Sequence, residues 1–216
     1  EARLKKALWT ENPQGHKIVH YHAQTEHDEA DYIAGVIYNR HSIENEPYGH
    51  MAILFRTNSQ SRVLEEKLMR YGIPYTMVGG TKFYDRKEIK DVIAYLRVLY
   101  NPEDSLSLVR ILNVPKRSIG ATSIEHLTDY AEANGISLFD ALSTTEELPV
   151  TKRVKTALED FAALIFSLLG EVSKTDVPTL IERVVKETGY GDMLDKEAAQ
   201  DPQGESRKEN VGQLIN

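Results

Sequence analysis

The chain has 216 residues, of which 41% are hydrophobic and 27% charged, as expected of a folded protein with one large domain or two small ones. It contains no cysteine, which excludes disulfides, thiolate zinc sites and a cysteine nucleophile. The net charge of −7 argues against a polybasic surface, but it leaves room for phosphate contacts made by a few placed cations.

The first third of the chain alternates short apolar segments with helical patterns. Three segments are short and rich in apolar or β-branched side chains, as buried strands are: residues 17–23, 51–55 and 74–78. Residues 26–40 between them carry apolar side chains at spacings of three and four, and Thr25 with Asp28 predicts a capped helix start. With a second helix before Gly72, this order predicts a partial parallel α/β sheet over residues 1 to about 82.

From about residue 86 onward the sequence predicts helices separated by proline and glycine. The predicted helices comprise residues 88–100, 105–112, 122–133, 138–142, 152–169 and 178–187. Pro202 and Gly204 make residues 198–207 a predicted mobile loop, after which residues 209–216 begin another helix. We therefore expect an all-α domain over residues 83–216.

The first candidate binding site lies where the segment 51–55 meets the next helix. Ligands of parallel α/β sheets bind at the carboxyl ends of strands, and helix N-termini favour anions. Arg56 offers a planar set of donors, and Asn58, Ser59 and Ser61 add hydrogen bonds, which suits a phosphodiester backbone. The alternative is an ordinary capped helix in which Arg56 pairs with a carboxylate, and the residues alone favour neither interpretation.

The second candidate site is the turn 115–120 between two predicted helices, which has the outline of a helix-hairpin-helix. Glycine lets the backbone turn tightly, so that successive N–H groups point at one phosphate, and Lys116 and Arg117 add cationic side chains. We expect a positive φ at Gly120, or an approach that a Cβ would block. The alternative is an ordinary helical turn with a basic surface.

Residues 79–91 have the composition of a hinge between two domains. Two glycines come first, then an aromatic pair, then a charged helix start. Phe83 and Tyr84 could stack on bases, but we favour a packed joint between domains as their role.

Four blocks of sequence, in this order, resemble the PcrA/UvrD/Rep-type superfamily 1A DNA helicases, and the PcrA branch most closely. They comprise residues 52–65, 79–96, 113–120 and 206–210, and residues 8–12 fit as well. The resemblance implies a 3′–5′ translocase driven by ATP, with two RecA-like motor subdomains and an insertion in each. Residues 1–82 then correspond to the start of the second motor subdomain (2A), and residues 83–216 to most of its helical insertion (2B).

The resemblance also implies which residues contact DNA. Single-strand contacts are implied for Arg56, Thr57 and Asn58. Duplex contacts are implied for Lys116, Arg117, Ser118, Ile119, Gly120, Thr122, Ser206 and Arg207. The hinge between the subdomains is implied at Gly79, Gly80 and Arg86. The usual hairpin pattern of the family is Gly-Ile-Gly, and this sequence has Ser118 in place of the first glycine.

No catalytic and no metal-binding residue is predicted in this chain. The sequence has no phosphate-binding loop of the P-loop type and no clustered carboxylates at strand ends. We expect the isolated chain to be inactive. The full-length protein is expected to be an ATP-dependent DNA helicase, a DNA-stimulated ATP hydrolase that uses ATP and Mg²⁺ in DNA repair or replication.

Single-stranded and forked DNA are the expected partners, with RNA polymerase or repair proteins as further partners of the 2B part. The alternative function is a protein-interaction module that docks such partners, with DNA contact secondary. No apolar run approaches the roughly 18 residues of a membrane span, and the first residues are polar, unlike a signal peptide. We therefore expect a cytoplasmic protein that contacts no membrane.

Overall fold

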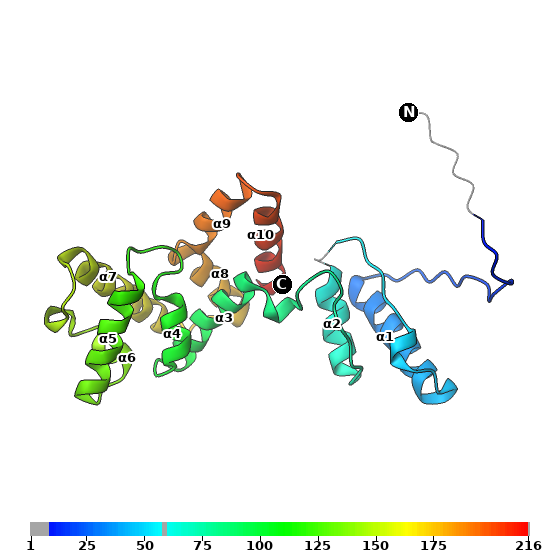
Figure 1. Cartoon of the computed structure of the whole chain (residues 1–216), viewed down its shortest axis with the longest axis horizontal. Coiled ribbons are helices and arrows are strands. Elements are labelled where there is room, and N and C mark those ends of the chain that lie inside the picture. Colours follow the sequence, from blue (N-terminus) through cyan, green and yellow to red (C-terminus); the bar gives the residue numbers. More distant parts are fainter. Residues whose placement is uncertain (1–8, 58–59, 216) are drawn as a thin grey trace.

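The computed structural model describes residues 9–57 and 60–215, and within these ranges every regular element is a helix (Figure 1). The elements follow in the order α1 (Glu26–Glu44), η1 (Tyr48–His50), α2 (Ser61–Arg70), η3 (Phe83–Asp85), α3 (Lys87–Tyr100), α4 (Ser105–Leu112), α5 (Ala121–Asn134), α6 (Leu138–Ala141), η4 (Thr145–Glu147), α7 (Lys152–Leu169), α8 (Val177–Glu187), α9 (Tyr190–Ala198) and α10 (Pro202–Ile215). None of the described helices combines the length and apolar character that crossing a lipid bilayer would require.

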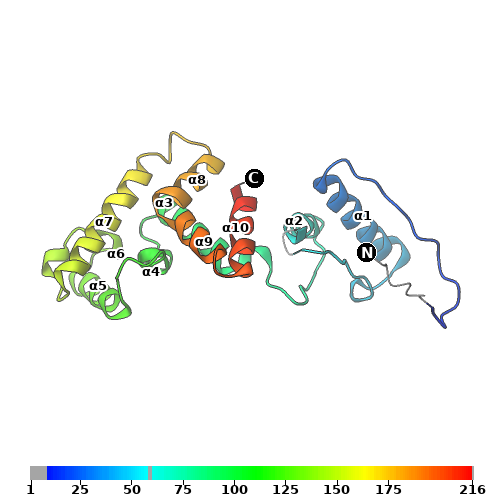
Figure 2. The ribbon, with the colours of Figure 1, turned by 90° about the horizontal axis from the view of Figure 1, so that it is seen from above.

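The helices form two groups along the long axis of the molecule (Figures 1 and 2). Helices α1 and α2 pack side by side and form the α1–α2 body, whereas α3 to α10 form the helical body. The segment between α2 and α3 joins the two groups, and the predicted boundary between residues 82 and 83 falls within it. The assignment of the two parts to a motor subdomain and its insertion stays a prediction.

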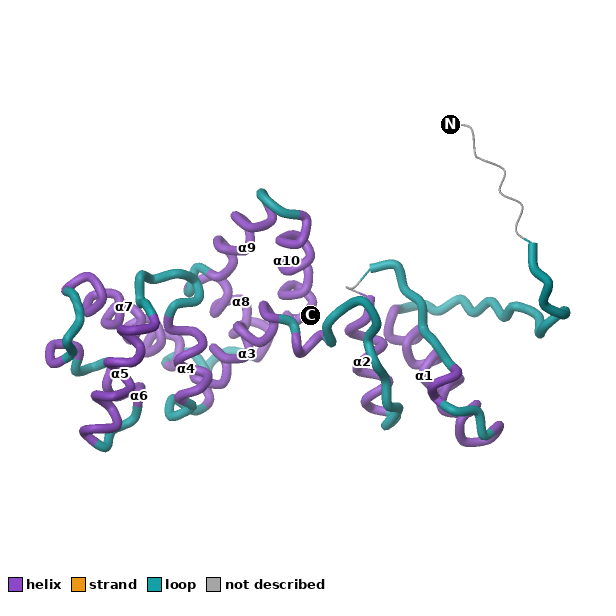
Figure 3. Tube along the Cα trace, in the orientation of Figure 1, coloured by secondary structure: helices purple, strands orange, loops and turns teal. Residues whose placement is uncertain are grey.

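The predicted parallel sheet over residues 1 to about 82 does not occur in the described part of the chain, so the α/β fold class is wrong. The three expected strands are loops (Figure 3). Ile18, Leu54 and Val78, one in each segment, are 98%, 95% and 91% exposed. Apolar composition favours burial, but a strand also needs a neighbouring strand that pairs with its N–H and C=O groups. These segments have no such neighbour among the residues described.

Most predicted helices are confirmed, because local caps and apolar spacing determine where they begin and end. Thr25 Oγ1 accepts the Asp28 N–H at 3.1 Å and caps α1 as expected. Asp104 and Asp176 cap α4 and α8 in the same way. Helices α4 and α7 begin and end at the predicted residues.

The predicted mobile loop over residues 198–207 is wrong, because α9 ends and α10 begins there, and the two helices pack against each other (Figure 1). Pro202 is the first residue of α10, where a missing N–H costs no helical hydrogen bond. Gly204 lies against the end of α9, and a Cβ built on it would come within 2.4 Å of the Ala198 nitrogen. The glycine therefore permits a close helix contact.

Two buried apolar clusters hold the helical body together, and helix α3 contributes to both. The larger cluster includes Tyr95, Leu108, Ile119, Leu127, Phe161 and Val184, from α3, α4, α5, α7, α8 and the turn before α5. The smaller cluster joins Val92 of α3 to Tyr190 and Leu194 of α9 and to Val211 of α10. The Tyr95 hydroxyl donates to the Val114 carbonyl oxygen, so the core also fixes the turn that leads into α5.

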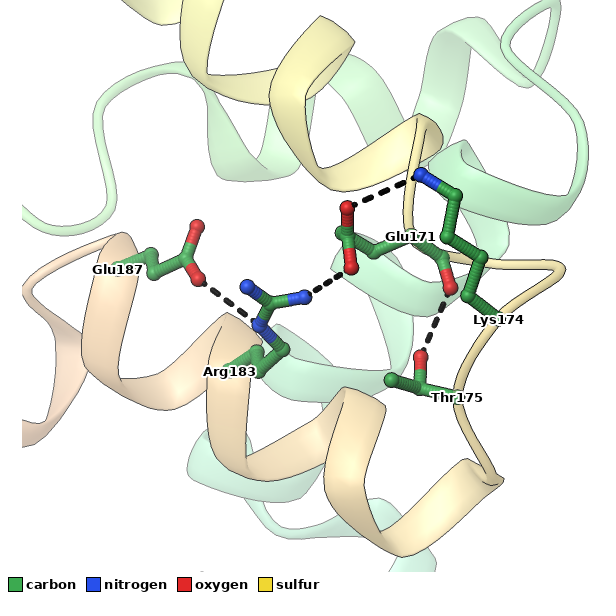
Figure 4. Close-up of polar contacts among 5 residues, drawn as sticks. All are labelled: Glu171, Lys174, Thr175, Arg183 and Glu187. Carbon is green, nitrogen blue, oxygen red and sulfur yellow. Dashed lines mark hydrogen bonds and ion pairs between the residues drawn. The ribbon is translucent and has the colours of Figure 1, made fainter.

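Ion pairs connect the loop after α7 to α8 (Figure 4). Arg183 on α8 bonds to Glu171 in that loop and, at 3.1 Å, to Glu187 of α8. Lys174 lies 3.3 Å from Glu171, and the Thr175 hydroxyl donates to the Glu171 carbonyl oxygen at 2.8 Å. The hydrogen bonds from Arg183 and Lys174 hold the pKa of Glu171 below its ordinary value. This cluster lies entirely within the helical body.

We expect Gly204→Ala to lower the free energy of unfolding by about 1–3 kcal/mol, because the new Cβ would overlap backbone atoms of α9. Thermal unfolding followed by circular dichroism measures the change. Gly212→Ala on the same helix is the matched control, since a Cβ there meets no atom within 4 Å. The control should be neutral or gain up to about 1 kcal/mol of helix propensity. Equal melting temperatures for the two variants would contradict the close helix contact.

Candidate nucleic-acid interface

The loop before α2 carries the predicted single-strand contacts. The Gln60 side chain accepts the N–H groups of Arg56 at 3.0 Å and of Thr57 at 3.3 Å, which holds the backbone of these two residues in place. Arg56 is exposed, and within the described ranges its guanidinium has no hydrogen-bond or ion-pair partner. The alternative in which Arg56 pairs with a carboxylate is therefore not the arrangement seen. Asn58, the third predicted contact, lies outside the described residues.

A pocket of about 540 Å³ opens beside this loop. Glu26 and Glu29 of α1 line one side, Arg56 and Arg62 line another, and Gln213 of α10 reaches it as well. The Gln213 Oε1 atom is buried, and none of the described residues forms a hydrogen bond with it. The pocket gives the loop a concave surface at which the exposed Arg56 forms a cationic edge.

The side chain of Asn113 organises the turn between α4 and α5. Its Oδ1 atom accepts the N–H of Arg117 at 2.7 Å and that of Ile119 at 3.3 Å. The Ile119 side chain is fully buried in the larger apolar cluster. The turn is therefore fixed from inside by one polar and one apolar anchor.

The exposed part of the turn is formed by Lys116, Ser118 and Gly120. Ser118 has a positive φ of 64°, whereas Gly120 has a φ of −82°. A Cβ on Gly120 would meet nothing within 4 Å, so the expectation of a positive φ or a blocked approach at Gly120 is wrong. Position 118 is the one that favours glycine. No described group accepts the backbone N–H of Ser118 or of Gly120.

Arg117 turns toward the interior instead of the solvent. Its guanidinium donates to the carbonyl oxygens of Ile111 (3.2 Å), Pro115 (3.1 Å) and Thr188 (3.1 Å) and to the Tyr95 hydroxyl (2.9 Å), and it lies 5.2 Å from the centre of the Phe161 ring. Both its side chain and its backbone N–H are thus engaged within the protein. The predicted duplex contact of Arg117 stays untested, and Lys116 is the cation of the turn that faces solvent.

Arg153, near the start of α7, is a cation that sequence reasoning did not connect with this turn. Its Nη2 atom donates to Ser118 Oγ at 2.8 Å, although 35 residues separate the two positions. The Arg153 side chain is exposed. The sequence carries no signal for this contact, because it depends on how α7 folds back toward the turn.

Ser206 and Arg207 do not lie at the turn. Arg207 bonds to Glu197, in the last turn of α9, at 2.6 Å, and this hydrogen bond raises the pKa of Arg207. The turn contacts Thr188, directly before the other end of α9. The nine residues of α9 extend about 13 Å at the usual helical rise. Thr122, by contrast, is exposed in the first turn of α5, next to Gly120.

At the predicted hinge, Gly79 has a positive φ of 76° and the Arg86 side chain is buried. The hinge role of Gly79, Gly80 and Arg86 stays a prediction. In residues 9–57 and 60–215, no group of three or more His, Cys, Asp or Glu side chains is arranged to hold a metal ion.

Residues 1–188 match the family described as the UvrD-like helicase C-terminal domain. The chain is 47% identical over 213 residues to the ATP-dependent DNA helicase PcrA of Staphylococcus epidermidis. It is 45% identical over 213 residues to the protein of the same name from Staphylococcus aureus. Each match covers 99% of this chain but 29% of the relative, so the chain spans less than a third of the length of these curated relatives.

Replacing Arg117 or Lys116 by methionine should separate an internal role from a surface role. Arg117→Met removes the donor from four internal oxygens, so we expect the free energy of unfolding to fall by about 2–4 kcal/mol. Lys116→Met should change it by less than about 0.5 kcal/mol, as surface substitutions usually do. Urea unfolding of both variants measures the difference. Equal losses would mean that the Arg117 contacts do not stabilise the turn.

Proposed function

Since the chain belongs to the family of UvrD-like helicase C-terminal domains, we propose that it is the DNA-binding part of a 3′–5′ ATP-dependent DNA helicase. Its substrates are single-stranded and forked DNA in repair or replication. Two relatives carry the name ATP-dependent DNA helicase PcrA, and a match along 99% of this chain supports the same activity for the whole protein. The proposed location is the cytoplasm, where the DNA lies in the bacteria that supply these relatives.

The structure of the turn between α4 and α5 is the main support for this proposal. It presents the backbone N–H groups of Ser118 and Gly120 without partners in the described structure, at the start of helix α5. Backbone N–H groups that point out of a turn bind a phosphate without reading the base sequence. Lys116 and Arg153 add positive charge on the exposed side. A helicase needs contacts of this kind, because it moves along DNA of any sequence.

The exposed Arg56 is the proposed contact to the single strand. Its guanidinium is free to form a charge-assisted bond to a phosphate oxygen, which is among the stronger hydrogen bonds in proteins. The Gln60 side-chain oxygen accepts the Arg56 N–H, so the Arg56 side chain projects from a backbone position that is held in place. Thr57 and Asn58 belong to the same proposed contact.

ATP and Mg²⁺ are proposed to act in the whole helicase, with no role assigned to residues of this chain. The donor set that Mg²⁺ prefers is a group of carboxylate oxygens, and the described residues offer no such cluster. The sequence also lacks a P-loop. The residues present therefore do not fit a nucleotide site, and no step of ATP hydrolysis follows from them.

A protein-docking role is the second candidate, and one surface feature favours it. Tyr100 at the end of α3 and Leu106 near the start of α4 are 90% and 87% exposed. Large exposed apolar side chains suit contact with another protein. RNA polymerase and DNA-repair proteins are the partner classes that the resemblance to the helicase family implies.

Arg56→Ala should weaken binding of single-stranded DNA and leave duplex binding unchanged, whereas Lys116→Ala should do the reverse. A lost charge-assisted phosphate bond costs about 1.5–3 kcal/mol. For the DNA whose binding each variant weakens, the slope of log affinity against log salt concentration should also become smaller by about one. Fluorescence anisotropy at several salt concentrations measures both effects.

Arg70→Ala is the control for these two variants. It removes the same charge from the other end of α2, where Arg70 is exposed. Its affinity for either DNA should stay within about twofold of the parent. Equal losses of affinity in all three variants would show that binding depends on the overall charge and not on the positions of Arg56 and Lys116.

We expect the isolated chain to hydrolyse no ATP, even with single-stranded DNA present, because it has no P-loop. A phosphate-release assay tests this directly. Turnover near the roughly 10 per second typical of enzymes, in a preparation free of contaminating ATPases, would refute the assignment of ATP to other parts of the helicase.

A further inference from the structure

The α1–α2 body and the helical body are joined by polar contacts around one buried ring, that of Phe83, whose centre lies 5.8 Å from the Arg62 guanidinium of α2 and 5.1 Å from that of Arg86. The apolar cluster of the α1–α2 body centres on Ala34, Leu68 and Ile73. No buried apolar cluster formed by the described residues has members in both bodies. A side chain that bridges the two bodies therefore has a large influence on how they are placed.

Arg86 is such a side chain. It directly precedes α3, and only 8% of its surface is exposed. Its Nη2 atom donates to Ser61 Oγ at 2.7 Å, and its Nη1 atom donates to Asn210 Oδ1 at 2.6 Å. Ser61 is the first residue of α2, and Asn210 lies in α10. One guanidinium thus bonds to both bodies, across 25 residues on one side and 124 on the other.

The groups around Arg86 are themselves held in place. The Asn210 amide nitrogen donates to Glu88 Oε1 at 2.6 Å, which directs the amide oxygen toward Arg86. Glu65 of α2 is 3% exposed and accepts the Phe83 N–H at 3.2 Å. Burial lowers the pKa of Arg86, while the charges of Glu65 and Glu88 oppose that effect. The Asn210 partner of the guanidinium is therefore itself bonded within a buried polar network.

Arg86 lies in the chain between the two proposed DNA contacts and is linked to each of them. Ser61 follows the loop that carries Arg56. On the other side Arg86 precedes α3, and Tyr95 of α3 bonds both to Val114 and to Arg117 in the turn before α5. A change in the position of Arg86 would therefore change the distance between the loop and the turn.

We propose that Arg86 is a positioning residue that sets the spacing between the Arg56 loop and the 113–120 turn, so that one forked DNA occupies both. This inference rests on the proposed function. When two sites on one molecule are held at the right spacing, binding of the second arm becomes intramolecular and the fork binds far more tightly than either arm.

The first test measures the affinity of the parent chain and of Arg86→Met for three DNAs: a single strand, a duplex and a fork made of both. We expect the parent to bind the fork at least about 100-fold more tightly than either arm. In Arg86→Met each arm should bind within about twofold of the parent, while the fork should lose about tenfold or more. An unchanged fork advantage in Arg86→Met would overturn the proposal.

Arg183→Met is the matched control, because Arg183 of α8 also forms an ion pair with a separate segment, the loop after α7, but both lie in the helical body (Figure 4). It should keep the full fork advantage. Ser61→Ala removes a single bond of the bridge and gives a milder variant in case Arg86→Met does not fold. It should lose part of the fork advantage, and full retention would count against the proposal.

A second readout needs no DNA and separates this inference from the proposed function. The chain has no cysteine, so Glu44→Cys in α1 and Glu132→Cys in α5 introduce two unique label sites, both of them exposed. Spin-label distances should form one narrow distribution in the parent and in Arg183→Met, and a broad or shifted one in Arg86→Met. A parent that binds neither arm refutes the proposed function, whereas an unchanged distribution in Arg86→Met refutes the bridge.

Discussion

Helix α3 lies in the middle of the helical body, and the charges that it buries determine which elements surround it. Asp91 is 2% exposed and is bonded by Arg110 of α4 at 2.8 Å and by the hydroxyl of Tyr190, the first residue of α9, at 3.0 Å. A buried carboxylate without partners costs on the order of several kcal/mol, so both elements must lie within reach of one residue. One turn earlier, Glu88 imposes the same requirement on Asn210 of α10.

The positions of the two proposed DNA contacts depend on helix α3. Tyr95 fixes the turn before α5 from the middle of α3, and Arg86 fixes the start of α2 from the residue before it. Burial together with the Asp91 charge raises the pKa of Tyr190, which keeps its hydroxyl a donor at neutral pH. The two proposed DNA contacts are thus attached to one helix, one near its start and the other near its middle, although neither belongs to it.

Local signals in the sequence predict the helices well, and they fail where structure depends on distant partners. Apolar spacing and caps such as Thr25 locate α1, α4 and α7, because these signals act within one or two helical turns. The expected sheet fails because apolar runs predict burial without providing a pairing strand. Gly204 is misjudged for a related reason, since a glycine that ends a helix and one that permits close packing look alike until the neighbouring helix is placed.

For the candidate site, the sequence predicts the segments but not the direction of the side chains within them. Arg117 and Lys116 are adjacent cations, yet one is bonded inside the turn and the other faces solvent. Ion pairing likewise separates engaged from unpaired cations among the described residues. Arg62, Lys67, Arg110, Lys155, Arg207 and Lys208 are paired with carboxylates. Charges on a protein surface act over a screening length of about 8–10 Å, so a paired cation adds little to the field that a phosphate meets. Arg56 and Lys116 are among the cations that the described structure leaves without a carboxylate, so their charge is available to a phosphate in the proposed DNA contacts.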